Sequence, residues 1–236
     1  MYHIVRIAIV SDIHGNLIAL EAVLADLRDS VPDLILHGGD LPIGGSAPAE
    51  VIDRIRDLGW PGVLGNTDEI LFDPGSAPNL GALSAPIQEI AAWNRDAVGL
   101  ERINWLRSLP RVLQGDGIAI VHATPESTWR SPGPESTDAE LRDVYTALAP
   151  LAVFGHVHRS FVRVMDGLTV ANSGSVSLSY DGDQRASYLL VDDGVALVRR
   201  VAYDLQREIR AVLESGQPHA AWTVRMLETA RPAMPG

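Results

Sequence analysis

Residues 4–16 read Ile-Val-Arg-Ile-Ala-Ile-Val-Ser-Asp-Ile-His-Gly-Asn, and this stretch sets the fold class. Its apolar part, Ile4–Val10, is short and rich in β-branched residues, which is typical of a strand buried in a sheet. Asn16 is a good helix N-cap, and leucines at helical spacing follow it. Leu34–Leu36 is a second short apolar run. The order strand, helix, strand predicts a parallel pair joined by a right-handed crossover.

The alternation of strands and helices continues to about residue 160. Further helices are predicted over 48–58, 84–98, 101–109 and after Thr137, and further strands over 62–64, 118–121 and 151–154, with a loop over 72–83. From Phe161 onward, four strand-like segments are joined by short turns, which predicts antiparallel hairpins. The last ~35 residues have the pattern of one or two amphipathic helices.

These elements predict an α/β fold with two packed sheets and helices outside them. No linker separates the parallel first part from the antiparallel second part. We therefore expect one domain over residues 1–236, with the C-terminal helices from about residue 203 packed on it or at an interface.

The composition excludes several kinds of chemistry. The chain has 236 residues and no cysteine, which removes disulfides, zinc ribbons and thiol nucleophiles. All 19 basic residues are arginine, so a Walker-type phosphate loop and Schiff-base chemistry, which need a lysine, are also excluded. The formal net charge of −11 argues against tight, non-specific binding to a nucleic-acid backbone or an anionic membrane, since both require a positive field.

The sequence shows no targeting or membrane-spanning pattern. Its start lacks a charged segment followed by a long apolar one and a cleavage site, and no apolar run approaches the ~20 residues that a bilayer span needs. We expect a cytoplasmic protein with no membrane partner. The sequence leaves open whether the chain forms a homo-oligomer.

Metal-binding side chains follow the ends of five predicted strands. Because ligands in α/β proteins collect outside the carboxyl ends of the strands, we expect these side chains to converge on one patch. Four histidines, two aspartates and an asparagine are too many donors for one zinc ion and suit two ions that share a carboxylate. The residues are Asp12, His14, Asp40, Asn66, His122, His156 and His158.

The motifs that contain these residues resemble those of the calcineurin-like metallophosphoesterases, in order over roughly residues 4–200. Asn-Ser-Gly-Ser-Val at 172–176 and Arg-Ala-Ser-Tyr at 185–188 resemble the small bacterial and archaeal phosphodiesterase branch. The resemblance implies a four-layer αββα sandwich of two mixed sheets flanked by helices. The five motifs are Asp12-Ile-His-Gly-Asn16, Gly39-Asp40, Gly65-Asn66, Val121-His-Ala123 and Gly155-His-Val-His158.

The resemblance also implies a dinuclear centre with Asp40 as the bridging ligand. By the family pattern, metal 1 takes Asp12, His14, Asp40 and His158, and metal 2 takes Asp40, Asn66, His122 and His156. The ions are divalent, and Mn²⁺, Fe²⁺ and Zn²⁺ all suit these donors. A metal-bridging hydroxide would then attack the phosphorus of a small phosphodiester or phosphomonoester substrate. Asn16, Asn66 and Arg159 are the candidates for binding that substrate.

Two other functions stay open at this stage. The first is a non-catalytic protein-interaction scaffold on the same fold, and the second is an acyl hydrolase that uses the same ions. The scaffold would have lost metal ligands, whereas all seven positions here hold competent donors. Metal content and a panel of esters distinguish the three functions.

One position departs from the family pattern. Where many members have Gly-Asn-His followed by an acidic residue, this chain has Gly65-Asn66-Thr67-Asp68. That histidine is thought to protonate the leaving group, which a threonine hydroxyl cannot do near neutral pH. With Thr67 at this catalytic position, we expect good activity only on leaving groups that depart without a proton. The alternative is that Thr67 fills space and that a water or another residue supplies the proton.

Overall fold

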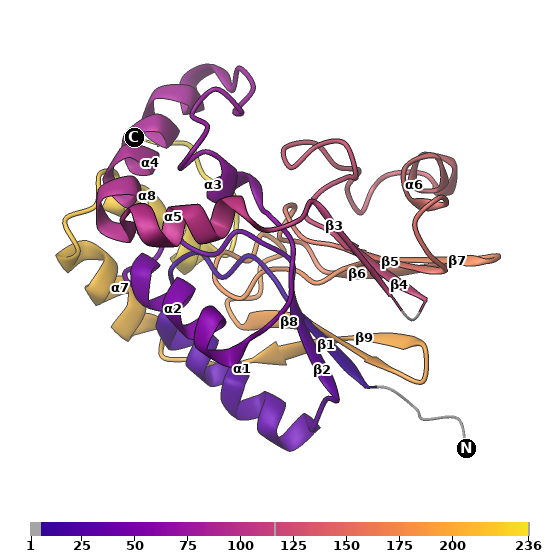
Figure 1. The fold of residues 1–236 in the computed structure, drawn as a ribbon. Helices are drawn as coiled ribbons and strands as arrows, with labels where there is room; N and C mark the ends of the chain where they lie inside the picture. The colour runs from indigo at the N-terminus through magenta and orange to yellow at the C-terminus, as the bar shows by residue number, and fades with distance from the viewer. Residues whose placement is uncertain (1–5, 116, 236) are drawn as a thin grey trace.

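The structure is a computed structural model that describes residues 6–115 and 117–235 (Figure 1). Its first sheet has the strand order β2-β1-β8-β9. The pair β1 and β2 is parallel, as predicted, and the two pairs that involve β8 are antiparallel. The strands are β1 (Ile7–Val10), β2 (Leu34–His37), β8 (Ala186–Asp192) and β9 (Val195–Val201).

The second sheet has the order β3-β4-β5-β7-β6. Its inner strands β4, β5 and β7 run parallel, and an antiparallel strand closes each edge. Both sheets are therefore mixed. The strands are β3 (Val112–Gly115), β4 (Ile118–Val121), β5 (Leu151–Phe154), β6 (Phe161–Met165) and β7 (Leu168–Asn172).

Alternation of side chains along the strands builds the layers. In β1, Ile7 and Ile9 pack between the two sheets, while Ala8 and Val10 pack outward against helices α1 and α2. In the second sheet, Val153 faces the first sheet, and Phe154 packs outward against α6. Each sheet thus has both faces covered at its centre, which is why β1, β4 and β5 are apolar throughout. This arrangement is the predicted α/β sandwich of two mixed sheets flanked by helices.

Most helices lie on the side of the first sheet, and α6 lies on the second (Figure 1). Asn16 caps α1 by accepting from the amide of Ala19, and Thr137 with Glu140 forms the predicted capping box of α6. The helices are α1 (Leu17–Ser30), α2 (Pro48–Leu58), α3 (Asn66–Glu69), α4 (Ser84–Val98), α5 (Leu100–Arg107), α6 (Asp138–Tyr145), α7 (Leu205–Glu214) and α8 (Ala220–Thr229).

The structure differs from the local predictions at three places. Residues 62–64 form no strand: Gly62 makes a single parallel bridge to His37, and Leu64 then donates to the carbonyl of Pro110 instead of continuing along β2. Strand β3 was not foreseen, because its half-polar sequence becomes a strand only by pairing with β4. The predicted loop over 72–83 ends in a short 3₁₀ helix, Gly81–Leu83.

Two further observations bear on the sequence-based expectations. Residues 4 and 5 of the first predicted strand lie outside the described residues. Within the described ranges, no helix combines the length and the apolar character that crossing a bilayer requires.

Candidate metal centre

The carboxyl ends of four strands, two from each sheet, meet at one site. The segments after β1 and β2 carry Asp12, His14 and Asp40, and the segments after β4 and β5 carry the other three histidines. Asn66 comes from the start of the short helix α3. The cluster therefore lies where the two sheets meet, and neither sheet alone could assemble it.

The backbone at five of the seven predicted ligands is left-handed. The φ angle is 56° at Asp12, 50° at His14, 56° at Asp40, 66° at His156 and 54° at His158. Left-handed conformations are uncommon for non-glycine residues and cost roughly 1–3 kcal/mol each in strained cases, so they persist only where the surrounding structure imposes them. Such strain is concentrated at functional sites. Here the left-handed conformations direct the side chains into the cluster.

A backbone carbonyl fixes one ring nitrogen of each of the four histidines. A carbonyl oxygen only accepts hydrogen bonds, so the nitrogen that faces it carries the proton, and the other nitrogen of a neutral ring keeps its lone pair for a metal. The pairs are His14 Nδ1 with Ile43 (2.5 Å), His158 Nδ1 with Leu178 (2.6 Å), His122 Nδ1 with Gly38 (2.7 Å) and His156 Nε2 with Trp129 (3.0 Å).

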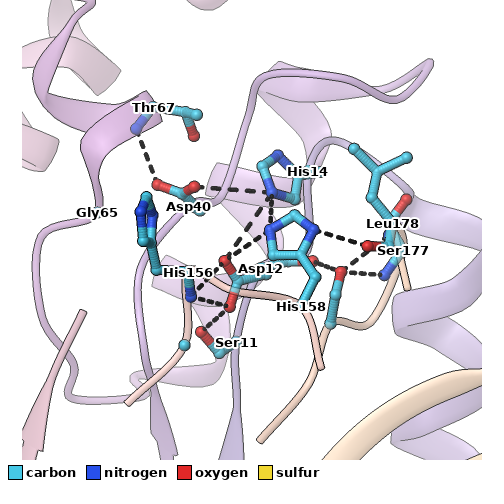
Figure 2. A network of polar contacts seen from close by, with 12 residues as sticks. Ser11, Asp12, His14, Asp40, Gly65, Thr67, His156, His158, Ser177 and Leu178 are labelled. Carbon is cyan, nitrogen blue, oxygen red and sulfur yellow. Dashed lines mark hydrogen bonds and ion pairs between the residues drawn. The ribbon is translucent and has the colours of Figure 1, made fainter. Parts of the chain in front are cut away.

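The first group of ligand atoms comprises Asp12, His14, Asp40 and His158 (Figure 2). All four offer a ligand atom within 4.8 Å of the others, and all are buried. The free Nε2 atoms of His14 and His158 lie 3.1 Å apart, and Asp12 Oδ1 lies 3.1 Å from His158 Nε2. Two facing lone pairs repel unless a proton or a cation lies between them. The donor set and its spacing therefore fit a divalent cation.

The second group comprises Asp40, Asn66, His122 and His156. The side-chain oxygen of Asn66 lies 2.9 Å from His122 Nε2 and 2.8 Å from His156 Nδ1. Asp40 faces both groups, because its Oδ1 lies 3.4 Å from His122 Nε2 and its Oδ2 lies 3.6 Å from His14 Nε2. A rotated amide would donate from its nitrogen to the same ring nitrogens. With its oxygen inward, the arrangement fits a second cation that shares Asp40 with the first.

The buried carboxylates favour positive charge at one histidine of the cluster. Burial opposes the ionisation of Asp12 and Asp40, yet His158 lowers the pKa of Asp12 and His122 lowers the pKa of Asp40. Burial likewise opposes a charge on His122, but the Asp40 carboxylate raises the pKa of that ring to about 10. His156, which is also buried, has its pKa lowered to about 4. The two carboxylates thus favour a proton on His122, whereas burial lowers the pKa of His14 and of His156.

Comparison with known proteins agrees with this geometry. Residues 5–193 match the Calcineurin-like phosphoesterase superfamily domain. The chain belongs to this superfamily. Its sequence is 30% identical to an uncharacterized protein of Methanocaldococcus jannaschii, over 90% of this chain and 93% of that protein. The chain is thus a member of the metallophosphoesterase family that carries a buried Asp/His cluster able to hold a metal.

Solved structures show the same architecture. A metallophosphoesterase from Sphaerobacter thermophilus is 26% identical and superposes with a TM-score of 0.79, covering 96% of this chain and 99% of that one. A hypothetical protein from Pyrococcus horikoshii OT3, 18% identical, has a TM-score of 0.83 and coverage of 97% and 100%, which shows a shared fold. The sandwich is therefore found, over nearly the whole length of this chain, in both solved structures.

The structure places the remaining candidate residues as follows. Thr67 donates its backbone amide to Asp40 Oδ1 at 2.8 Å, and in the described part of the chain its buried hydroxyl has no partner. The amide of Asn16 is engaged in the helix cap and with Ser177. Arg159 makes an ion pair with Glu135 at 2.5 Å and is 43% exposed. Substrate binding by Asn16 and Arg159 stays a prediction.

Asp68 is a supporting residue that sequence reasoning missed. Its Oδ2 accepts from the amides of Asp40 (3.0 Å) and Gly65 (2.8 Å), and its Oδ1 accepts from that of Leu41 (2.9 Å). Burial and the nearby Asp40 raise the pKa of Asp68 to about 7. It joins the loop after β2 to the start of α3, and so fixes Asp40 relative to Asn66. An acidic residue at the third position of a helix was the available signal.

Two serines hold the other aspartate. Ser11 donates to Asp12 Oδ2 at 2.5 Å (Figure 2), and Ser175 donates to the carbonyl of Asp12 at 2.7 Å. Ser175 lies in the Asn-Ser-Gly-Ser-Val segment at 172–176, to which the sequence patterns assigned no contact with the site. Its hydroxyl also accepts from the amides of Ser177 and Leu178, so it links the loop after β7 to the metal site.

Proposed function

We propose that the chain hydrolyses a small phosphodiester with two divalent ions held by the Asp/His/Asn cluster. The observation that carries this proposal is the set of four histidines, each with one ring nitrogen bonded to a carbonyl and the other directed at a buried carboxylate or at Asn66. A protein that used this fold only as a scaffold would have no need for four such orientations, each of which requires a specific backbone position.

The residues have separable tasks in hydrolysis. Bound divalent ions would lower the pKa of a water and stabilise the negative charge that develops on the phosphoryl group. Asp40 fixes the spacing of the two groups of ligands, since its two oxygens face different histidines. The Thr67 backbone amide holds Asp40 Oδ1 in that orientation. In the balanced reaction, water adds hydroxide to phosphorus and its remaining proton leaves with the released alcohol.

The charge around the site supports a diester over a monoester. A monoester carries up to two negative charges, whereas a diester carries one. Among the described residues that line the cavity beside the cluster, none is an arginine. Arg159, the nearest candidate along the chain, is paired with Glu135. With a formal net charge of −11, the chain offers little long-range attraction to a dianion.

Metal analysis combined with an ester panel tests the proposal. We expect protein purified without added metal to retain manganese, iron or zinc, approaching two ions per chain, and to cleave aryl phosphodiesters faster than aryl phosphomonoesters. Asp40→Asn should lower metal content and reduce activity by more than about 100-fold, because loss of a partner that merely orients a ligand already costs about 10–100-fold. Asp29→Asn, on the exposed face of α1, is the matched control and should change neither.

The other outcomes identify the alternatives. Metal content far below two ions per chain, with Asp40→Asn as active as the unmodified protein, would refute the enzymatic proposal. Bound metal without turnover of any ester would favour the protein-interaction scaffold. Turnover of carboxylesters without turnover of phosphoesters would indicate an acyl hydrolase.

A further inference from the structure

An apolar cavity adjoins the metal cluster. His14, Asn66 and Thr67 form one side of it, and the other sides come from elements far apart in the sequence. These include Ile87 and Ile90 of α4 and Trp222 and Met226 of α8. Because ligands of both metal groups line the cavity, a group bound there lies next to a phosphoryl group held by the cluster.

The chemistry of the lining is selective. Among the described residues that line it there is no arginine, aspartate or glutamate, and most of the surface is aliphatic or aromatic. A nucleoside that entered this cavity would bury hydroxyl and ring nitrogen groups with few partners, and each unpaired polar group costs about 1–3 kcal/mol. An apolar group has no polar atoms to leave unpaired, and its transfer out of water into the cavity is favourable in free energy.

The size of the cavity sets an upper limit on that group. Its volume is about 110 Å³. A dry protein cavity of about 150 Å³ lined by Leu, Ile and Phe binds benzene. The cavity therefore has room for a short branched alkyl chain, or for one small ring that projects partly out of it. It cannot enclose a purine nucleoside.

The C-terminal helices that close the cavity are tied to the metal ligands. Leu178, whose carbonyl fixes His158, packs with Met226 and with α7. Gln217, between α7 and α8, is buried and donates to the carbonyl of Gly44, next to the carbonyl that fixes His14. The matched superfamily domain ends at residue 193, so this wall lies outside it.

From this cavity we infer the substrate class: a phosphodiester in which one alcohol is a small apolar group, such as a benzyl or branched alkyl group, that occupies the space between α4 and α8. The inference rests on the proposed phosphodiesterase function for its reaction, and on the cavity for its selectivity. Met226 and Ile87 are the specificity-determining residues.

The test measures the binding of three methyl phosphodiesters to the metal-loaded protein by titration with ligand-observed NMR. Benzyl methyl phosphate should bind about tenfold or more tightly than dimethyl phosphate or thymidine 5′-methyl phosphate, because each methylene-sized contact in an apolar pocket is worth about tenfold or more. Met226→Gln should remove most of this preference without changing the affinity for dimethyl phosphate. If Met226→Gln fails to fold, Ile87→Thr gives the same readout, because Ile87 is half-buried and also lines the cavity.

Leu213→Ala is the matched control, since Leu213 lies on α7, is 55% exposed and is not part of the lining. Equal affinities for the three diesters, or equal weakening of all three by the cavity substitutions, would overturn the inference. Hydrolysis of methyl 4-nitrophenyl phosphate separates the two proposals. Hydrolysis without selective binding of the benzyl diester supports the proposed function and refutes the cavity assignment. Selective binding that depends on Met226, without any hydrolysis, supports the cavity assignment and refutes the proposed function.

Discussion

Replacing Gly65 by alanine tests whether the approach of α3 to the loop after β2 sets the geometry of the metal centre. Gly65 has φ −94° and ψ 170°, a conformation that alanine adopts freely, so the substitution adds no backbone strain. The new methyl group, however, would overlap the backbone nitrogen and Oδ1 of Asp40. It would also lie 3.0 Å from the Asp40 Cα atom.

The size of the effect follows from these distances. Carbon atoms in contact prefer a separation of about 3.5–4.0 Å, so Asp40 or the start of α3 must move by at least about 0.5–1 Å. Overpacking of this kind costs about 1–3 kcal/mol. For a chain of this length, that lowers Tm by about 2–4 °C per kcal/mol. A displacement of about 1 Å at a reacting centre lowers activity about 100-fold.

The assay compares Gly65→Ala with Gly115→Ala. A methyl group at Gly115 meets no atom of the described residues within 4 Å, and the Gly115 backbone is not left-handed, so this variant controls for the chemical change itself. We expect only Gly65→Ala to lose metal content, kcat/KM on an aryl diester and Tm. If both variants keep the metal content of the unmodified protein and melt within about 1 °C of each other, the close packing of Gly65 on Asp40 does not hold the site, and the reasoning is wrong.

Three further predictions concern Thr67, Asp68 and His37. Thr67→His should accelerate the hydrolysis of diesters with poor leaving groups, by up to about 10²–10⁴-fold, more than that of activated aryl diesters. Metal content should stay unchanged. Equal effects on both classes of diester would show that Thr67 does not set leaving-group preference. Asp68→Asn should leave at least one of three buried amides unpartnered, which lowers the free energy of unfolding in urea by about 1–3 kcal/mol. The substitution should also weaken metal binding about 10–100-fold. Unchanged metal affinity would contradict the positioning role of Asp68. Burial lowers the pKa of His37 to about 4. Below the ordinary histidine pKa of about 6.5, His37 binds a proton in the unfolded chain but not in the folded chain. The contribution of His37 should therefore lower the free energy of unfolding by about 2 kcal/mol from pH 7 to pH 5. His37→Leu should lack that part of the pH dependence, and an identical pH profile for the two proteins would refute it.

The sequence alone determined most of the elements and the positions of the candidate ligands. Apolar runs such as Leu151–Phe154 and the capping box at Thr137 are local patterns, and each formed as predicted because its own residues favour it. The prediction that the strand ends would converge also needed only local information, since each strand carries its ligand at its own carboxyl end. Residues 62–64 show the limit of such patterns, because an apolar triplet becomes a strand only if a neighbour pairs along its whole length.

Only the tertiary structure decided how the ligands are oriented and what lies beside them. Which nitrogen of His14 or His158 is free depends on the carbonyls of Ile43 and Leu178, and a carbonyl exists at every residue, so no sequence pattern marks those two. The apolar cavity is equally hidden, because Met226 reaches the site only through the packing of α8 on Leu178 and α7. Sequence patterns record how neighbouring residues interact, whereas contacts between segments far apart in the chain depend on how whole layers pack. That packing orients the candidate ligands and places the apolar cavity beside them.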